Sequence, residues 1–501
     1  MNLQEKGFHW IPVSKVLEVA PKVSSGDPVD EFLPGPLGAW CLWYVVMGLI
    51  TQKLQDTIVV QHGPNGCNSA ARTFFIEHVG SSYGMGFPHI VSTDMAQGEV
   101  VLGGEDKLRS VIVQADRDYK PSLIIVHTNC ASGLNMDDVQ GVIQSVQGEV
   151  KAKLHFIPTP GFCSCYPGEQ MHMALPQFVD LMEPPKNVNP RAVNLIGVVK
   201  EVAVIRGKHG EWIPKIPQDS NPYVNYIQKL GLTFHRGVIG GTYDYLKTAP
   251  EAAVNVIQCN AWGYPVGEAM LKKFGTPYLK HGMCIGVDAT VKWIKDLANF
   301  MNVQKEGDRL IDEEYAQVKD IMKKAKEMVT GKIALISGGR NTFNTVTRAL
   351  GLARFAIELG MTPYIFNMGP MHTALKPEVV KYFAGEGCDP KYLLGPYAWQ
   401  SAIDIQDIMN NLGVGTGDVV YFPGDVFNYA KAGEFDPGNT PRLDVGQSFG
   451  RVRNAPRSAG IKAAGSMARG IIDAVNASKR NSQWTLYGRM FGSKVKFMET
   501  A

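Results

Sequence analysis

The first three cysteines of this chain each lie within two residues of a glycine or an alanine. They are Cys41 in GAWCLW, Cys67 in HGPNGC and Cys130 in HTNCASG. Thiolates that bind iron–sulfur clusters favour turns with such residues, because small neighbours and free backbone N–H groups let a sulfide approach. Their wide spacings fit neither a zinc knuckle nor a two-cysteine redox motif. Three thiols are fewer than the four that usually hold a cluster, so a partner chain would supply the rest; buried, inert cysteines are the alternative.

The bulk composition limits the class of protein. The chain has 501 residues, 45% of them hydrophobic and 19% charged, which allows a large core and roughly three domains. The net charge of +3 gives no electrostatic reason to expect binding to nucleic acid or an anionic membrane. The N-terminus lacks a secretory pattern, and the apolar stretch near it, Ala39 to Ile50, is shorter than the about 20 residues of a membrane span. We therefore expect a cytoplasmic protein, whose thiols stay reduced.

Buried strands are expected where continuous apolar runs end at glycine-rich or polar turns. The strongest runs are Thr57–Gln61, Ser122–His127, Ala192–Gly197, Ala252–Gln258, Lys332–Ser337, Pro363–Phe366 and Val419–Phe422. Their alternation with helical patterns indicates parallel sheets covered by helices on both faces. Ligands bind such sheets beyond the carboxyl ends of the strands, which is where Cys67, Cys130 and Cys259 fall.

These elements predict an α/β fold of three Rossmann-like domains, with parallel sheets flanked by helices. The expected domains are residues 1–185, with the first three cysteines, residues 186–330, with Cys259, and residues 331–501, which include a C-terminal tail. The charged stretch Gln304–Lys332 predicts one helix with a solvated face that leads into the third domain.

Several longer runs resemble the catalytic component of nitrogenase and its relatives. They are HGPNGC at 62–67, VVLGGEDKL at 100–108, HTNCASGLNMDD at 127–138, VIQCNAWGYPVGEAMLKKFGTPYLKHG at 256–282 and GKIALISGG at 331–339. The separation of Cys41 from Cys67 and the segment around Cys259 resemble the α-type (D) subunit. Two runs, YKPSLIIVHTNC and GGTYDYLKTAP, are as close to the β-type subunit.

The resemblance implies two metal groups. Cys41, Cys67 and Cys130 would hold half of an 8Fe-7S P-cluster shared with a β-type (K) subunit, in an α2β2 heterotetramer. Cys259 would bind the terminal iron of an Fe8S9C-type iron–sulfur cofactor of unknown heterometal. An ATP-dependent iron protein (H-type reductase) would supply the electrons one at a time.

Further residues would surround that cofactor. Gly338 and Gly339 would contribute to its binding, and Arg340 would offset the negative charge of a cluster from a loop at a strand end. His172 approximates the histidine that nitrogenase points at its substrate, and it is our first candidate for a proton donor. A salt-bridge role for Arg340 and a core position for His172 are the alternatives.

One departure from nitrogenase concerns the far end of the cofactor. No histidine follows His372, and the stretch Arg457–Gly460 has none where nitrogenase α subunits carry the histidine that grips the heterometal. His281 and His372 are alternative ligands. The pattern most resembles methylthio-alkane reductase. That resemblance implies reductive C–S cleavage of small organic sulfur substrates, such as 2-(methylthio)ethanol or dimethyl sulfide, with release of methanethiol and a small hydrocarbon.

Three other functions fit the same residues. A nitrogenase cofactor assembly scaffold also keeps the cofactor cysteine and lacks the histidine. A nitrogenase-like tetrapyrrole reductase subunit would carry a smaller cluster, and a β-type chain would be a nonenzymatic interaction subunit. Cys284 and Cys388 are expected in the core or on the surface, Cys163 and Cys165 have no assigned role, and His62 is more typical of a hydrogen-bonded turn residue than of a ligand.

Overall fold

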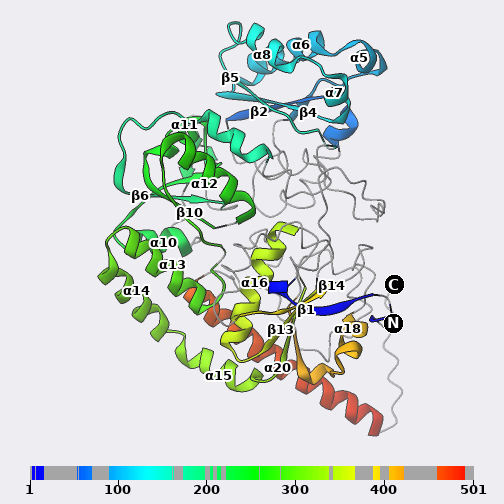
Figure 1. The fold of residues 1–501 in the computed structure, drawn as a ribbon, viewed down its shortest axis with the longest axis vertical. Helices are drawn as coiled ribbons and strands as arrows, with labels where there is room; N and C mark the ends of the chain where they lie inside the picture. Colours follow the sequence, from blue (N-terminus) through cyan, green and yellow to red (C-terminus); the bar gives the residue numbers. More distant parts are fainter. Residues whose placement is uncertain are drawn as a thin grey trace.

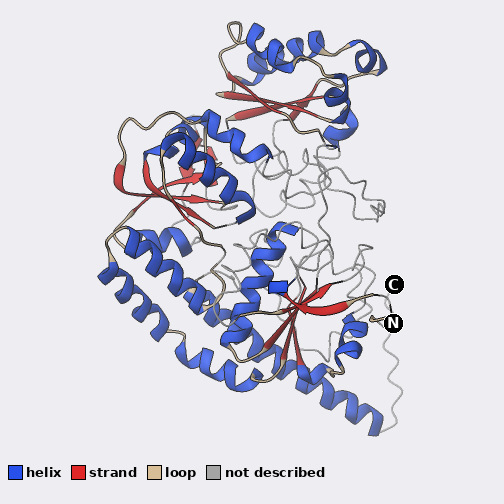
Figure 2. Ribbon diagram, in the orientation of Figure 1, coloured by secondary structure: helices blue, strands red, loops and turns tan. Residues whose placement is uncertain are grey.

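The computed structural model describes residues 3–5, 7–15, 54, 56–69, 90–160, 162, 173–197, 203–206, 212–215, 222–258, 260–282, 284–337, 342–366, 388–394, 405–422 and 460–490. Figure 1 shows three α/β units in these parts of the chain, and Figure 2 distinguishes their sheets from the helices around them. The predicted fold class, parallel sheets flanked by helices, is confirmed.

The first sheet carries the turns of the predicted cluster ligands. Its four strands are mutually parallel, and they run in the order β3 (Ile90–Ser92), β2 (Thr57–His62), β4 (Leu123–Thr128) and β5 (Lys153–Ile157). Every residue of β2 and β4 is buried, as expected for central strands of a parallel sheet. Helices α6 (Glu105–Tyr119) and α8 (Val139–Val146) pack on this sheet through apolar faces.

The second sheet is again parallel throughout. It has the order β11 (Tyr278–Leu279), β10 (Ala252–Ile257), β6 (Asn189–Ile196) and β9 (Thr233–Val238). Helix α12 (Asn260–Phe274) follows β10 after a short turn, and its contacts with the strands are close. A two-stranded antiparallel ribbon, β7 (Ala203–Arg206) with β8 (Trp212–Lys215), lies in the connection between β6 and β9.

Within the described residues the third sheet has five strands, one of them from the N-terminal part of the chain. Its order is β1 (His9–Pro12), β14 (Lys391–Leu394), β13 (Thr362–Phe366), β12 (Ile333–Ser337) and β15 (Val419–Phe422). All pairs are parallel except β1 with β14. The expected first domain of residues 1–185 includes residues 9–12, which the structure places in the third sheet. Leu3 and Phe8 are buried against that sheet, which explains the attachment.

The order of the strands reverses once among the described strands of each sheet. In the first sheet the chain passes from β2 to β3 on one side and then to β4 on the other side of β2. In the second sheet the chain passes from β6 to β9 on one side of β6 and then to β10 on the other side. In the third sheet it passes from β12 to β13 and β14 on one side of β12 and then to β15 on the other side. Such switch points open a crevice beyond the carboxyl ends of the two diverging strands, where ligands bind in sheets of this kind.

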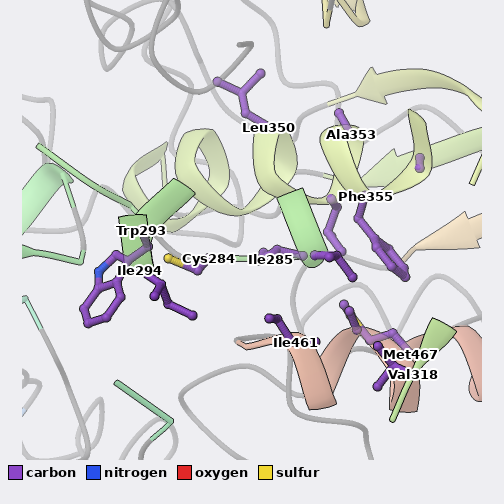
Figure 3. Packing of buried hydrophobic residues seen from close by; sticks show 14 of the residues in the cluster. Cys284, Ile285, Trp293, Ile294, Val318, Leu350, Ala353, Phe355, Ile461 and Met467 are labelled. Carbon is purple, nitrogen blue, oxygen red and sulfur yellow. The ribbon is translucent and has the colours of Figure 1, made fainter. Parts of the chain in front are cut away.

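A large apolar core joins the second unit to the third. Figure 3 shows Ile285 between α16 (Thr342–Glu358) and α20 (Ile461–Met490). Ile285 is fully buried, and a Cβ on Gly351 of α16 would lie 3.0 Å from its Cδ1. Cys284 and Cys388 both belong to this cluster, which decides between the two positions expected for them, core or surface.

The charged stretch at 304–332 departs from its prediction. It forms two helices, α14 (Gln304–Ala316) and α15 (Lys319–Val329), because the chain turns at Gln317 and Val318, and Val318 is buried. Its surface is also not uniformly solvated. Glu314 is only 2% exposed, and it accepts hydrogen bonds from Tyr226 and Lys229 of α10 (Pro222–Lys229), each at 2.8 Å.

Within the described part of the chain, no helix combines the length and the apolar character that a membrane crossing requires.

Candidate functional site

The carboxyl ends of β2 and β4 bring two of the predicted ligands together. The two strands are paired in register up to His62 and Thr128. Beyond them, Cys67 lies in a helical turn at 65–69 and is half-buried, and Cys130 begins helix α7 (Cys130–Asn135) and is exposed. Burial raises the pKa of the Cys67 thiol, and the nearby Cys130 thiol raises it further. Since β2 and β4 are paired in register, the turns that follow them hold both cysteines at the same edge of the sheet.

Asn129 supplies a hydrogen-bond donor at this pair of thiols. Its Oδ1 caps α7 by accepting from the backbone N–H groups of Ala131, at 2.9 Å, and Ser132, at 3.3 Å. Its amide is close enough to Cys67 to lower the pKa of that thiol. The buried Nδ2 nitrogen nevertheless has no hydrogen bond of normal length within the described residues.

These groups suit an iron–sulfur cluster. Two neighbouring thiols provide the soft ligands that iron clusters take from proteins, and an unpaired amide donor suits a cluster sulfide. A buried donor without a partner is costly, so a sulfide beside Nδ2 would remove that cost. Within the described residues the two thiols stand without a third ligand, because no group of three possible metal ligands occurs there.

Gly63 lets the two thiol-bearing turns approach each other. Its φ of +152° lies in a range that L side chains rarely adopt, and a Cβ at this position would lie 1.8 Å from Asn129 Nδ2. Any other residue would have to displace Asn129, so the glycine of the HGP turn is required by contact as well as by conformation.

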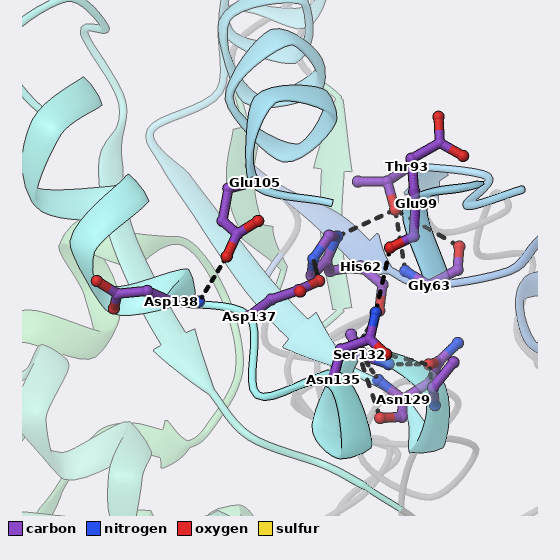
Figure 4. A network of polar contacts seen from close by, with 11 residues as sticks. His62, Gly63, Thr93, Glu99, Glu105, Asn129, Ser132, Asn135, Asp137 and Asp138 are labelled. Carbon is purple, nitrogen blue, oxygen red and sulfur yellow. Dashed lines mark hydrogen bonds and ion pairs between the residues drawn. The ribbon is translucent and has the colours of Figure 1, made fainter. Parts of the chain in front are cut away.

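His62 is fully hydrogen-bonded at the base of the site, as Figure 4 shows. Its Nε2 is 2.8 Å from Asp137 Oδ2, and its Nδ1 is 3.1 Å from Thr93 Oγ1. Burial lowers the pKa of His62, and Asp137 opposes that shift. The prediction that His62 is hydrogen-bonded is confirmed, and His62 is the last residue of β2, directly before the Gly-Pro turn.

Exposed apolar side chains lie on and beside α7, the helix that Cys130 begins, and on the neighbouring helix at 97–102. Helix α5 (Gln97–Leu102) is joined to α7 by a hydrogen bond of 3.2 Å from Asn135 Nδ2 to the Glu99 carbonyl oxygen. The apolar rim consists of Val101, Leu102, Leu134, Met136 and Phe162, which are between 55% and 87% exposed. Surface side chains gathered in this way mark interaction sites.

The second predicted site lies beyond β10. The strand ends at Ile257 and α12 begins at Asn260, so Cys259 falls between them, outside the described residues. A Cβ on Gly263 would lie 2.4 Å from Ile257 Cγ2, so glycine allows the first turns of α12 to lie against the strand. Gln258 is 4% exposed, and its Nε2 has no hydrogen-bond partner within the described residues. A helix N-terminus and a donor of this kind suit an anionic group.

The other predicted site residues divide into two sets. Those outside the described residues are Cys41, His172, Gly338, Gly339, Arg340 and His372. His281 is described: it is 3% exposed, its Nε2 lies 3.5 Å from Asp296 Oδ2, and burial lowers its pKa to about 4. That imidazole is therefore neutral near pH 7.

The sequence reasoning missed the residues that support the thiols. Asn129, Thr93 and Asp137 act through hydrogen bonds to segments distant in sequence. Only one of them carried a local signal. Asn129 and Ser132 form a reciprocal cap at the start of α7, and the spacing N-x-x-S after an apolar run is typical of a helix start.

Comparison with known proteins now identifies the family. The family model for nitrogenase component 1 type oxidoreductases matches residues 43–425, well over half of the chain. The chain belongs to this family. The solved structure described as nitrogenase Cp1 at pH 5 superposes with a TM-score of 0.63, covering 87% of this chain and 88% of that chain at 18% identity. This likeness supports the fold.

Curated relatives of two kinds are similar to this member of the family. The nitrogenase molybdenum-iron protein alpha chain of Clostridium pasteurianum is 25% identical over 328 residues, which cover 64% of this chain and 58% of that relative. The nitrogenase iron-molybdenum cofactor biosynthesis protein NifE of Methanococcus maripaludis is 25% identical over 307 residues, 60% of each chain. The chain thus spans about 60% of the length of the curated relatives that it matches.

Proposed function

We propose that this chain is an α-type subunit of a nitrogenase-like reductase and that Cys67 and Cys130 bind a P-type iron–sulfur cluster. The observation that carries the proposal is that the turns after the paired strands β2 and β4 bear the two thiols, with the Asn129 side chain packed between those turns against Gly63. Iron–sulfur clusters are general in this family, which supports the choice of metal. When bound, such a cluster supplies one-electron transfer.

The chain's own residues would present and shield that cluster. Cys67 and Cys130 donate thiolates, and Asn129 Nδ2 donates to a sulfide. Cys41 is the third proposed ligand. Since three thiolates do not complete an eight-iron cluster, a β-type (K) subunit supplies the rest in the proposed α2β2 heterotetramer. A protein seated on the apolar rim would remove those side chains from water and exclude solvent from the thiols.

We further propose that Cys259 anchors an Fe8S9C-type cofactor at the carboxyl end of β10. The close packing of α12 at Gly263 and the unpartnered Gln258 amide support this placement. Around it, Gly338 and Gly339 contribute to binding, Arg340 offsets negative charge, and His172 delivers a proton.

The proposed substrates are methylthio-alkanes. Dimethyl sulfide takes up two electrons and two protons to give methane and methanethiol. The same two electrons and two protons convert 2-(methylthio)ethanol to ethylene, water and methanethiol. Electrons come from an ATP-dependent iron protein. The departure from nitrogenase around Arg457–Gly460, where no histidine occurs, supports a substrate other than dinitrogen.

A cofactor assembly scaffold is the second candidate. Its support is the similarity to NifE of Methanococcus maripaludis, which matches this chain as well as the nitrogenase alpha chain does. A scaffold releases its cofactor to an acceptor protein, whereas an enzyme turns over substrate with the cofactor bound. The two functions therefore differ in an assay even where they share ligands.

Iron content tests the cluster assignment. The chain is purified anaerobically with its partner, and iron per chain and EPR spectra are compared for wild type, Cys130→Ala and Cys259→Ala. Cys284→Ala is the matched control, because it removes a buried thiol of the core. We expect iron to fall in the first two variants and to stay constant in the control. Fewer than about two irons per wild-type chain would refute cluster binding.

Turnover separates the enzyme from the scaffold. The iron-loaded complex is supplied with ATP, the iron protein and either dimethyl sulfide or 2-(methylthio)ethanol. Methane or ethylene, each with one equivalent of methanethiol, supports the reductase. Transfer of the cofactor to a nitrogenase lacking it, with neither gas formed, would establish the scaffold instead.

A further inference from the structure

The imidazole of His62 is the point where three segments of the first unit meet. Asp137, which follows α7, approaches Nε2 to 2.8 Å, and Thr93, which follows β3, approaches Nδ1 to 3.1 Å. The side chain of His62 is fully buried and that of Asp137 is 2% exposed. Figure 4 shows the ring lying between these two partners. One side chain thus ties the ends of β3 and α7 to the end of β2.

The hydrogen bonds form a complete chain with a neutral ring. A carboxylate only accepts, so we assign the proton to Nε2, which donates to Asp137. Nδ1 then accepts from the Thr93 hydroxyl, whose oxygen accepts from the Gly63 N–H at 2.9 Å. Each donor from Gly63 to Asp137 has its acceptor. Burial lowers the pKa of His62, which agrees with the neutral form.

The backbone of His62 holds the other end of α7. Its carbonyl oxygen accepts from Ser132 Oγ at 2.7 Å and from the Asn129 N–H at 3.3 Å. These two residues flank Cys130. His62 therefore holds the N-cap and the first turn of α7 through its carbonyl oxygen, and the segment after the last turn through Asp137. The polypeptide then continues from His62 directly into the turn that bears Cys67.

We propose that His62, fixed by Asp137 and Thr93, is the positioning residue that sets the separation of the Cys67 and Cys130 thiols. It touches neither thiol and acts through α7 and the HGP turn. Loss of the Asp137 carboxylate would leave a buried N–H without an acceptor, and the end of α7 would have to move to relieve it. The inference concerns the thiols of the chain and holds whether or not iron binds them.

A short bifunctional reagent measures the separation directly. The full-length, metal-free chain is treated with dibromobimane, which bridges two nearby thiols, and is digested with trypsin. Cys67 and Cys130 fall in different tryptic peptides, 54–72 and 118–151, neither of which holds another cysteine. Mass spectrometry then counts the bridged and the singly modified peptides of this pair.

Asp137→Ala is the decisive variant. We expect the bridged fraction to fall roughly three- to tenfold, since a charge-assisted hydrogen bond no longer holds α7, with single modification of each thiol unchanged. Asp137→Asn keeps an acceptor oxygen and should recover most of the bridging. Thr93→Val, which keeps the shape and removes the hydroxyl, should lower the bridging and serves where Asp137→Ala does not fold.

Asp138→Ala is the matched control. Asp138 is the exposed neighbour that caps α8 by accepting from the Gly141 N–H at 2.9 Å, and it has no bond to His62. Its loss should leave the bridging unchanged. Equal bridging in Asp137→Ala and wild type, or an equal loss in Asp138→Ala, would overturn the inference. A wild-type chain that bridges but binds no iron would refute the proposed cluster and leave the inference standing.

Discussion

Gly63→Ala should disrupt the site more than the same substitution at Gly66, the other glycine of the HGPNGC turn. The backbone φ of +152° suits glycine, and the added Cβ would lie 1.8 Å from Asn129 Nδ2 and 2.2 Å from its Cγ. No small adjustment relieves overlaps of that size. The Asn129 side chain must leave its position, and it takes with it the cap of α7 and the donor beside Cys67.

The expected cost has two parts. An alanine held at this φ costs about 1–3 kcal/mol of backbone strain. Loss of the Asn129 cap, whose two hydrogen bonds are 2.9 and 3.3 Å long, adds about 0.5–2 kcal/mol. The Gly63→Ala chain should therefore be about 1.5–5 kcal/mol less stable in its first unit, and its iron content should fall because Cys130 directly follows the displaced residue.

Gly66→Ala provides the control within the same turn. Gly66 is exposed, and a Cβ there would meet nothing within 4 Å. Both variants are compared with wild type by urea denaturation, followed through hydrogen exchange of the β2 and α7 peptides, and by iron content after anaerobic reconstitution. Wild-type stability and iron in Gly63→Ala, or equal losses in Gly66→Ala, would refute the reasoning.

Three further changes test other parts of the structure. Burial raises the pKa of Glu358 from 4.5 to about 8 in the folded chain. The protonated side chain therefore contributes a free energy of folding that is fully present below pH 4.5 and is lost as the pH rises through about 8. Between pH 5 and pH 9 the free energy of unfolding of the wild type should fall by roughly 4 kcal/mol through this group, and Glu358→Gln should remove that fall. Urea denaturation across this pH range measures it. Glu314→Ala leaves the buried Tyr226 hydroxyl without its acceptor and should cost about 2–4 kcal/mol in the same assay, against almost nothing for the exposed Glu313→Ala. Gly263→Ala would place a methyl group 2.4 Å from Ile257 Cγ2, and it should cost about 1–3 kcal/mol and lower the iron bound at Cys259.

The strands were predictable because their signal is local. The run TIVVQ at 57–61 is β-branched, continuous and ended by a Gly-Pro turn, and it forms β2. VVYF at 419–422 forms β15 with the expected bounds. Since parallel strands present their carboxyl ends at one edge, placing Cys67 and Cys130 at that edge followed from the runs before them.

Contacts between distant segments were not predictable. Nothing in HWIP at 9–12 indicates that it pairs with residues 391–394, because an edge strand of four residues has no pattern of its own. Glu314 looks like any other acid on a charged helix, and its burial depends on where α10 packs. Asp137 is one of two adjacent aspartates, and the sequence does not tell which of them reaches His62.

The strand order explains why the predicted chemistry is spread over three turns. Among the described strands, each sheet has one switch point, between β2 and β4, between β6 and β10, and between β12 and β15. Cys67 and Cys130 follow the first pair of strands, Cys259 follows β10, and Gly338 follows β12 in the sequence. A crevice at a switch point is created by its own sheet, since the two connections diverge to opposite faces there. The positions of the thiols beside the first sheet therefore depend on the strand order of that sheet and on the hydrogen bonds of His62. The proposed cofactor turn depends on the fit of α12 against β10, so a substitution that loosens one turn should leave the other intact.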